Sequence, residues 1–191
     1  MAADSASTVG DPAWVDEVLS FWFGELDKAA WFEKSDGTDA LIRDRFTELY
    51  EKIAAAPAED QLTNSRRALA AVIVLDQFSR NMFRGSPKAF AADPVARAIA
   101  TGALDRGFGK DYGLHESAFM FLPFEHSEKL ADQDKSVELF SSLGDEEYTR
   151  YAIAHRDFIA RFGRFPHRNE VLGRQSAPEE TEFLTQPGSS F

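Results

Sequence analysis

The chain has 191 residues, of which 43% are apolar and 28% charged, and it carries a formal net charge of −11. This length and composition are typical of one globular domain with a sizeable core. The acidic balance argues against a duplex nucleic-acid partner, which requires a broad basic face. The absence of cysteine excludes disulfides, thiolate metal sites, iron–sulfur clusters and a cysteine nucleophile.

The N-terminal residues 1–10 are small and polar, and we expect them to form a disordered tail. They have neither the basic region nor the apolar core of a signal peptide. No run in the chain approaches the roughly 18 apolar residues of a membrane span. We therefore expect a cytoplasmic protein, with residues 11–191 forming a single all-helical domain and no membrane partner.

The first half of the chain shows helical spacing of its apolar residues. Asp11-Pro12 predicts a helix start, with Asp as N-cap and Pro in the first turn, and Gly24 predicts its end. A long helix is expected from Asp36 until Pro57 closes it. Its buried stripe is Ile42, Phe46, Leu49, Tyr50 and Ile53. From about Thr63 to Met82 we expect a central buried helix, because residues 68–75 are apolar all round. An eight-residue apolar run also suits a strand, but its alanines favour a helix.

The second half repeats these signals. Asp93-Pro94 predicts another helix start, and Gly102 its end. Residues 114–122 predict an apolar helix that Pro123 terminates. Helices are then expected around residues 130–140 and 148–162, separated by a turn at Gly144-Asp145. Residues 176–179 fit a capping box that opens a short last helix.

These elements amount to about seven substantial helices without strand alternation. Short connections between helices imply antiparallel helical hairpins. No strict internal repeat is visible, but a tetratricopeptide-like array of irregular hairpins is compatible with the pattern. The fold class predicted from the sequence is therefore all-α.

A first polar constellation ends the central helix. On a regular helix Asp76, Arg80 and Arg84 would stack at i, i+4 and i+8, and Gln77 would lie above Asn81. A buried carboxylate must be paired, and Arg80 is the nearest candidate. A structural salt-bridge network is favoured over a ligand site, since such networks mimic functional sites.

A second constellation follows Pro123. His126 lies between Glu125 and Glu128, where it could act as a general base oriented by a carboxylate. It could equally form the first turn of a helix, which is the favoured interpretation. The four histidines never form a close ligand pair, so neither a metal nor another cofactor is expected.

The third constellation is the stretch from His155 to Arg174. It holds five arginines and two acids, so its charge is +5 − 2 = +3 in an acidic chain. Arg161, Arg164 and Arg168 bracket a helix break at residues 163–166, where converging guanidinium groups could hold a carboxylate or phosphate. They could equally lock the C-terminal segment onto acidic helices. His155 lies on the apolar face of its helix, which is typical of a hydrogen-bonded core histidine.

We expect the three constellations to meet in one polar centre, because pairing across helices satisfies the charges of each. The candidate ligand-binding residues are Asp76, Gln77, Arg80, Asn81, Arg84, His126, Glu128, His155, Arg161, Arg164, His167 and Arg168.

The same blocks resemble a bacterial family of unknown function. They are FWFG at residues 21–24, LDQFSRNMFRG at 75–85, AFAAD at 89–93, HSE at 126–128 and RFGRFPHRNEVLGR at 161–174. The resemblance covers nearly the whole chain beyond Asp11. It implies an all-helical fold similar to tetratricopeptide-like arrays, and no established activity, substrate or cofactor.

Two functions remain open. The favoured one is a binding or scaffold protein for a small anionic molecule or a peptide, because no nucleophile–base or metal signature is specific enough for a reaction. The alternative is a general acid–base enzyme that uses His126 or His155 with an arginine anion clamp. The oligomeric state is left open.

Overall fold

A computed structural model describes residues 10–190, and within this range the chain is all-α, without a strand. Of the expected tail at residues 1–10, all but Gly10 lies outside the described residues. The helices are α1 (Ala13–Ser20), α2 (Asp36–Ala55), α3 (Ser65–Val72), α4 (Ser79–Met82), α5 (Asp93–Asp105), α6 (Leu114–Glu125), α7 (Leu130–Ser142), α8 (Glu146–Phe162) and α9 (Pro178–Leu184).

Two wider π-helical segments extend these helices. Phe21–Glu25 prolongs α1, so that this helix passes its expected end at Gly24. Ile73–Phe78 joins α3 to α4 in one helical run, which confirms the expected buried helix. Short 3₁₀ turns are found at Ala29–Trp31, Ala58–Gln61, Pro87–Phe90, Phe108–Asp111 and Pro166–Arg168.

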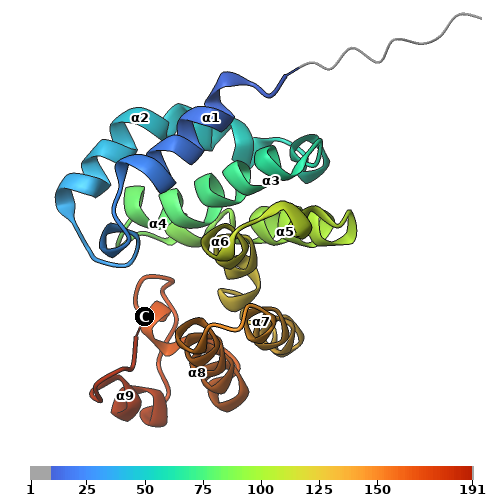
Figure 1. The fold of residues 1–191 in the computed structure, drawn as a ribbon. Coiled ribbons are helices and arrows are strands. Elements are labelled where there is room, and N and C mark those ends of the chain that lie inside the picture. The colour runs from blue at the N-terminus through green and yellow to red at the C-terminus, as the bar shows by residue number, and fades with distance from the viewer. Residues whose placement is uncertain (1–9, 191) are drawn as a thin grey trace, which may run out of the picture.

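The helices form two parts joined by α6. Figure 1 shows α1 to α5 gathered on one side and α7 to α9 on the other, with α6 between them. In the first part α1 packs on α3, α2 on α4, and α3 on α5. In the second, α7 and α8 pack as a hairpin across the short turn at Gly144. The likeness to a tetratricopeptide array remains a prediction.

Aromatic side chains fill the core of the first part. Phe21 and Trp22 pack edge-on against Phe78, and Trp22 also meets Phe119 of α6 at 5.4 Å between ring centroids. All four rings are fully buried. The apolar stripe of α2 is buried as predicted, apart from the half-buried Leu49. The central helix is therefore packed between the aromatic side chains that follow α1, the apolar stripe of α2 and helix α6.

Side-chain caps explain several helix starts. Ser35 accepts a hydrogen bond from Thr38 N at 3.2 Å ahead of α2, and Asn64 caps α3 through Arg67 N. The prediction that Asp11 caps α1 is wrong. Pro12 occupies that position, and the Asp11 carboxylate instead accepts a bond from Asn64.

Two predicted helix ends are wrong because packing overrides the local signal. Helix α5 continues through Gly102 to Asp105. A Cβ on Gly102 would lie 2.4 Å from Leu62 Cδ1, so this glycine permits close packing instead of ending the helix. Helix α6 continues through Pro123, which is buried, to Glu125.

The last helix begins later than predicted. Helix α9 starts at Pro178, so Ala177 takes the N-cap position that was expected for Ser176. The Glu180 carboxylate, rather than that of Glu179, accepts the hydrogen bond from the N-cap amide of Ala177 at 2.7 Å.

Across residues 10–190, no helix combines the length and apolar character needed to cross a bilayer.

Candidate functional site

The three polar constellations lie against one another. His126 Nδ1 is 2.8 Å from Asp76 Oδ1, and Arg168 Nη1 donates to the His126 carbonyl at 3.0 Å. The end of the central helix, the end of α6 and the elbow after α8 are thereby joined. We call this cluster the polar centre; it consists of Asp76, Arg80, Asp93, His126, Glu128, Arg168 and Arg174.

Asp76 is the buried anion of the polar centre. Asp76 lies in the π-helical segment Ile73–Phe78, which packs against α6, and its side chain is fully buried. Gln77 Nε2 donates to its second carboxylate oxygen at 2.6 Å, and Arg80 Nη1 lies 3.3 Å from the first. Burial alone would raise the pKa of this carboxyl group, but Arg80 and His126 outweigh burial and lower it. Asp76 is therefore ionised at neutral pH.

Arg80 bridges the central helix and α5. Its guanidinium forms a bidentate pair with Asp93 at 3.0 and 3.1 Å, and Nη1 also donates to the Asp76 carbonyl at 2.7 Å. Burial would lower the pKa of Arg80, but the charges of Asp76 and Asp93 raise it. The expected pairing of Asp76 with Arg80 is confirmed at 3.3 Å, and Asp93 is a second, bidentate partner of Arg80.

His126 follows the last residue of α6, so the interpretation as the first turn of a helix is wrong. Burial is the main reason why its pKa is lowered, although Asp76 works in the opposite direction. A neutral ring beside an ionised Asp76 must carry its proton on Nδ1. Among residues 10–190, Nε2 of His126 has no hydrogen-bond partner and is not fully buried. The ring therefore presents an acceptor nitrogen toward solvent.

Arg168 differs from the other arginines of the polar centre. Its guanidinium stacks over the rings of Phe90 and Phe165, with centroid distances of 4.7 and 4.4 Å. Its nearest carboxylate, Asp93, is 3.9 Å away, whereas Arg80 and Arg174 each have one within 3.1 Å. The buried Nε of Arg168, like that of Arg174, has no hydrogen-bond acceptor among the described residues. Burial, with the charge of Arg80, lowers its pKa to about 10. Arg168 is a buried cation with unused donors.

Glu128 fastens the elbow to the end of α6. It accepts two hydrogen bonds from Arg174, at 2.7 and 2.9 Å, and one from Phe165 N at 2.9 Å. Burial opposes ionisation of Glu128, but the bonds from Arg174 and Phe165 lower its pKa. These contacts hold Phe165 in place beneath Arg168.

Two further histidines surround His126. The ring of His155 lies 6.1 Å from that of His126, and its Nδ1 is 2.8 Å from Glu125 Oε1 and 2.9 Å from Tyr151 O. Burial and the charge of Arg168 lower the pKa of His167 to about 4. Both histidines were predicted as candidate site residues, and both lie beside the polar centre.

Four predicted candidates have their side-chain hydrogen-bond partners outside the polar centre, which corrects the expectation that all the candidates form one cluster. Helix α4 ends at Met82, so Arg84 leaves the face of Arg80 and pairs with Asp39 of α2 at 2.7 and 2.8 Å. Asn81 accepts from Arg84 at 3.3 Å.

Arg161 and Arg164, the other two of these four, point to α9. Arg161 pairs with Glu179 and Arg164 with Glu180, at distances of 2.6–2.9 Å. They lock the C-terminal helix onto the elbow, which is the second role considered for the arginine-rich stretch. Of the three elbow arginines, Arg168 alone contacts His126 among the described residues.

Two members of the polar centre escaped prediction. The Asp-Pro signal marked Asp93 as a helix start, which it is, but the same carboxylate also pairs with Arg80. Arg174 belongs to the arginine-rich stretch, yet its reach to Glu128 depends on the turn at Gly173, whose φ is 64°.

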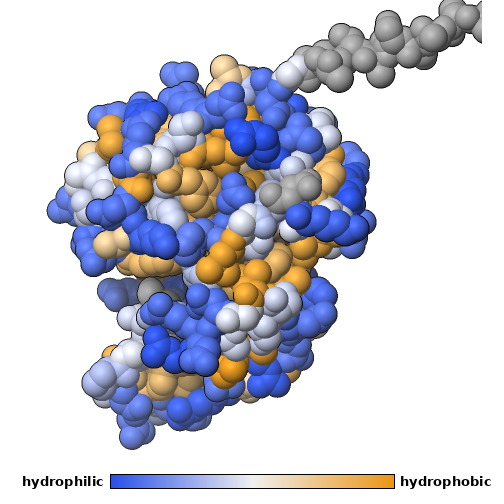
Figure 2. Space-filling model, viewed as in Figure 1, coloured by the Kyte–Doolittle hydropathy of each residue, from blue (hydrophilic) through white to orange (hydrophobic). Residues whose placement is uncertain are grey.

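The polar centre is partly open to solvent. The exposed fraction of the side chain rises from 1% for Asp76 to 14% for His126 and 28% for Glu128. Figure 2 shows the surface indented between the part formed by α1 to α5 and the C-terminal segments. These are the parts of the chain that carry Arg80 and Arg168.

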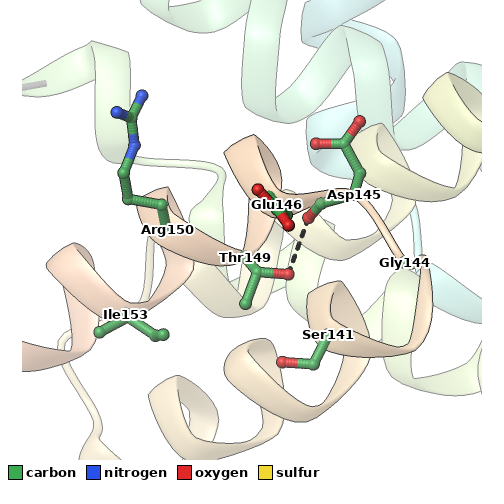
Figure 3. A pocket seen from close by; sticks show the side chains of 7 residues that line it. All are labelled: Ser141, Gly144, Asp145, Glu146, Thr149, Arg150 and Ile153. Atoms are coloured by element: carbon green, nitrogen blue, oxygen red, sulfur yellow. Dashed lines mark hydrogen bonds between the residues drawn. The ribbon is translucent and has the colours of Figure 1, made fainter.

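A hollow of about 470 Å³ lies at the turn between α7 and α8, away from the predicted candidates. Figure 3 shows Thr149 turned to the Asp145 carbonyl, to which it donates at 2.8 Å. The Asp145 side chain caps α8 through the amides of Glu147 and Tyr148. These groups complete a helix start and bring no reactive side chain together.

In residues 10–190, no three His, Asp or Glu side chains lie close enough together to hold a metal ion.

Comparison with known proteins identifies the family of the chain but no activity for it. A family model described as a bacterial protein of unknown function (DUF924) matches residues 18–188. A solved structure, of the protein of unknown function ATU0120 from Agrobacterium tumefaciens, is similar with a TM-score of 0.85 and 37% sequence identity, covering 90% of this chain and 97% of that one. The search of curated proteins found no match. The chain belongs to the DUF924 family of bacterial proteins of unknown function.

Proposed function

We propose that this protein binds a small organic anion at the polar centre, through Arg168 and His126. The observation that carries the proposal is that these two residues touch and both keep unused hydrogen-bonding atoms. Arg168 Nη1 donates to the His126 carbonyl, while Arg168 Nε and His126 Nε2 have no partner within residues 10–190.

The charge balance supports an anion next to Arg168. Arg80 is held by Asp93, and Arg174 by Glu128, through paired hydrogen bonds of 2.7–3.1 Å. A buried guanidinium without such a partner gains most from an anion, because charge-assisted hydrogen bonds are strong where water is scarce. Since aromatic rings cover the faces of Arg168, a ligand would approach in the guanidinium plane.

The state of His126 narrows the class of ligand. A neutral ring that donates from Nδ1 to Asp76 offers a lone pair at Nε2, so it accepts a hydrogen bond. The ligand we propose therefore combines a carboxylate or phosphate for Arg168 with a hydroxyl or ammonium donor for His126. Small hydroxy acids and sugar phosphates have this chemistry.

A matched ligand panel tests the proposal. The melting temperature is measured with glycolate against acetate, glycerol 3-phosphate against inorganic phosphate, and a short acidic peptide. A ligand that binds only the native state raises the melting temperature. We expect the members that carry a hydroxyl group to raise it more than their matched partners do.

Two lysine variants locate the site. Arg168→Lys keeps the charge but loses the planar fork, and we expect it to weaken binding by about tenfold. Arg161→Lys makes the same change at an arginine that Glu179 already holds, and should leave affinity unchanged. The proposal is overturned if no panel member raises the melting temperature, or if both variants weaken binding equally.

A second candidate function, general acid–base catalysis, is favoured by the Asp76–His126 contact of 2.8 Å. In this case a bound panel member would be converted, which one-dimensional NMR of the mixture detects. His126→Gln should then abolish turnover, whereas binding is weakened but not lost, because Arg168 still holds the anion. A ligand that binds and stays unchanged over many hours would leave binding as the function.

A further inference from the structure

We infer that a second anion-binding site lies in a pocket between the start of α2 and the end of α4, distinct from the polar centre. The pocket has a volume of about 470 Å³. It is lined by Lys34, Asp36, Asp39, Arg43, Arg84 and Gly85. We call it the cationic pocket.

The lining carries an excess of positive charge. Three cations face two acids, so the sum is +3 − 2 = +1 in a chain of net charge −11. Arg84 and Asp39 cancel each other in a bidentate pair at 2.7 and 2.8 Å. The remaining groups are Lys34, Arg43 and Asp36, whose charges again sum to +1.

Two of these cations have no acid partner among the described residues. Arg43 donates from Nε and Nη2 to a single carbonyl, Met82 O, at 3.4 and 3.3 Å, which is long for a hydrogen bond. Lys34 forms no hydrogen bond or ion pair with a described residue. Both groups are therefore free to bind an oxyanion without first breaking a salt bridge.

The backbone keeps this arrangement in place. Gly85 adopts the left-handed region with φ of 75°, and a Cβ there would meet no atom of residues 10–190 within 4 Å. The glycine is therefore needed for its backbone angle, which turns the chain directly after Arg84. On the other side, the Asp39 carboxylate is buried and holds the Arg84 fork at the pocket wall.

The ligand of the cationic pocket is an oxyanion group, either carboxylate or phosphate. The planar fork of Arg43 matches both groups, and Lys34 adds a mobile point charge. Asp36 lines the same pocket, so a group with a single negative charge balances the three uncommitted residues.

A titration followed by NMR tests this site. Acetate, inorganic phosphate and chloride are each added to the full-length protein at constant ionic strength, while the Arg43 Nε–Hε signal is observed. We expect acetate or phosphate, but not chloride, to shift this signal in a saturable manner at millimolar concentrations. The stronger of the two oxyanions identifies the ligand chemistry.

Three variants decide where the anion binds. Arg43→Gln and Lys34→Gln should each weaken binding by about fivefold to tenfold, as loss of one charged donor predicts. The Lys34→Gln titration follows the Arg43 signal, whereas the Arg43→Gln titration follows backbone amides of α2. Arg66→Gln is the matched control, because Arg66 is an exposed arginine that pairs with Asp16 on another surface.

The proposal is overturned if chloride competes as well as both oxyanions, or if Arg66→Gln weakens binding as much as Arg43→Gln. Arg168→Lys separates this site from the polar centre, since it should leave the Arg43 titration unchanged. If Arg168→Lys abolishes the Arg43 shift, the anion acts from the polar centre and the inference is wrong.

Discussion

Arg80 and Arg174 of the polar centre differ from Arg43 of the cationic pocket in whether an acid holds them. In the polar centre, Arg80 and Arg174 are each held by two hydrogen bonds to one carboxylate. In the cationic pocket, Arg43 donates to one carbonyl at 3.3 Å and pairs with no acid among residues 10–190. The difference follows from burial, because a buried cation must be paired whereas an exposed one remains hydrated.

Anions are expected to bind in this protein where an arginine lacks a close carboxylate partner. Arg168 is more buried than Arg80, yet among the described residues its nearest carboxylate is 3.9 Å away. Arg168 is therefore the one arginine of the described polar centre without a bidentate carboxylate partner. For this reason we propose that the organic anion binds there. In the cationic pocket the uncommitted cations are exposed, so an anion there binds in competition with water and salt.

The largest effect is expected from Asp76→Ala. Removing this enclosed carboxylate leaves Arg80 and His126 without their shared anion, and breaking a buried pair costs roughly 3–5 kcal/mol. Denaturant unfolding measures the change. Asp36→Ala in the cationic pocket is the matched control and should cost at most about 1 kcal/mol, the contribution of an acid to a helix start. Equal effects of the two substitutions would contradict the contrast between the regions.

The next effect is a loss of stability at moderately acid pH. The folded-state pKa values of His126 and His167 lie below the unfolded value of about 6.5, so the unfolded chain binds more protons between pH 6.5 and 4. Stability must therefore fall as the pH is lowered through this window. For His167, whose pKa is about 4, the loss is about 3 kcal/mol.

Unfolding curves at several pH values check this. His167→Gln should reduce the slope between pH 6.5 and 4 while leaving stability at pH 8 closer to that of the parent. Below about pH 4 the lowered pKa values of Asp76 and Glu128 add a further loss, as their carboxylates become protonated. A parent protein equally stable at pH 7 and pH 4.5 would refute the assignment of neutral buried histidines.

A smaller effect is expected from Glu128→Gln. This substitution weakens two charge-assisted bonds from Arg174 and the bond from Phe165 N, in a partly exposed place. We expect a cost of about 1–2 kcal/mol. Hydrogen exchange should accelerate first in the elbow at residues 163–175, since Glu128 fastens it; uniform acceleration throughout α6 would argue against this role.

The smallest effect on stability is expected in the cationic pocket. Arg43→Gln loses one long contact to a carbonyl, so the free energy of unfolding should change by no more than about 0.5 kcal/mol. Chemical denaturation at low and high salt measures it. A cost comparable to that of Asp76→Ala would mean that Arg43 is a structural residue and not an uncommitted cation.

Much of the fold follows from local signals in the sequence. The long helix from Asp36, the buried central helix and the hairpin around Gly144 each rest on apolar spacing and turn residues that the structure retains. The ends at Gly102 and Pro123 were predicted wrongly because tertiary packing decides them. Leu62 packs against Gly102 from a distant turn, and no local rule contains that contact.

The sequence predicted a polar cluster and the Asp76–Arg80 pair within it, but not most of the other pairs. That Asp76, His126 and Arg168 require partners follows from polar groups placed in or beside apolar segments. Which partner each obtains depends on where a helix stops: α4 ends at Met82, and this turns Arg84 to Asp39 instead of the polar centre. Lys34 and Arg43 were missed because they lie on an exposed surface, where sequence patterns carry little information.

The state of the His126 ring tests the proposed binding site most directly. Long-range ¹⁵N–¹H NMR spectra report its tautomer and its titration. We expect a neutral ring at pH 7 that is protonated on Nδ1, with a pKa below about 6.5 and an Nε2 resonance that moves when glycolate or glycerol 3-phosphate binds. An imidazolium at pH 7, or a proton on Nε2 of the neutral ring, would contradict this expectation.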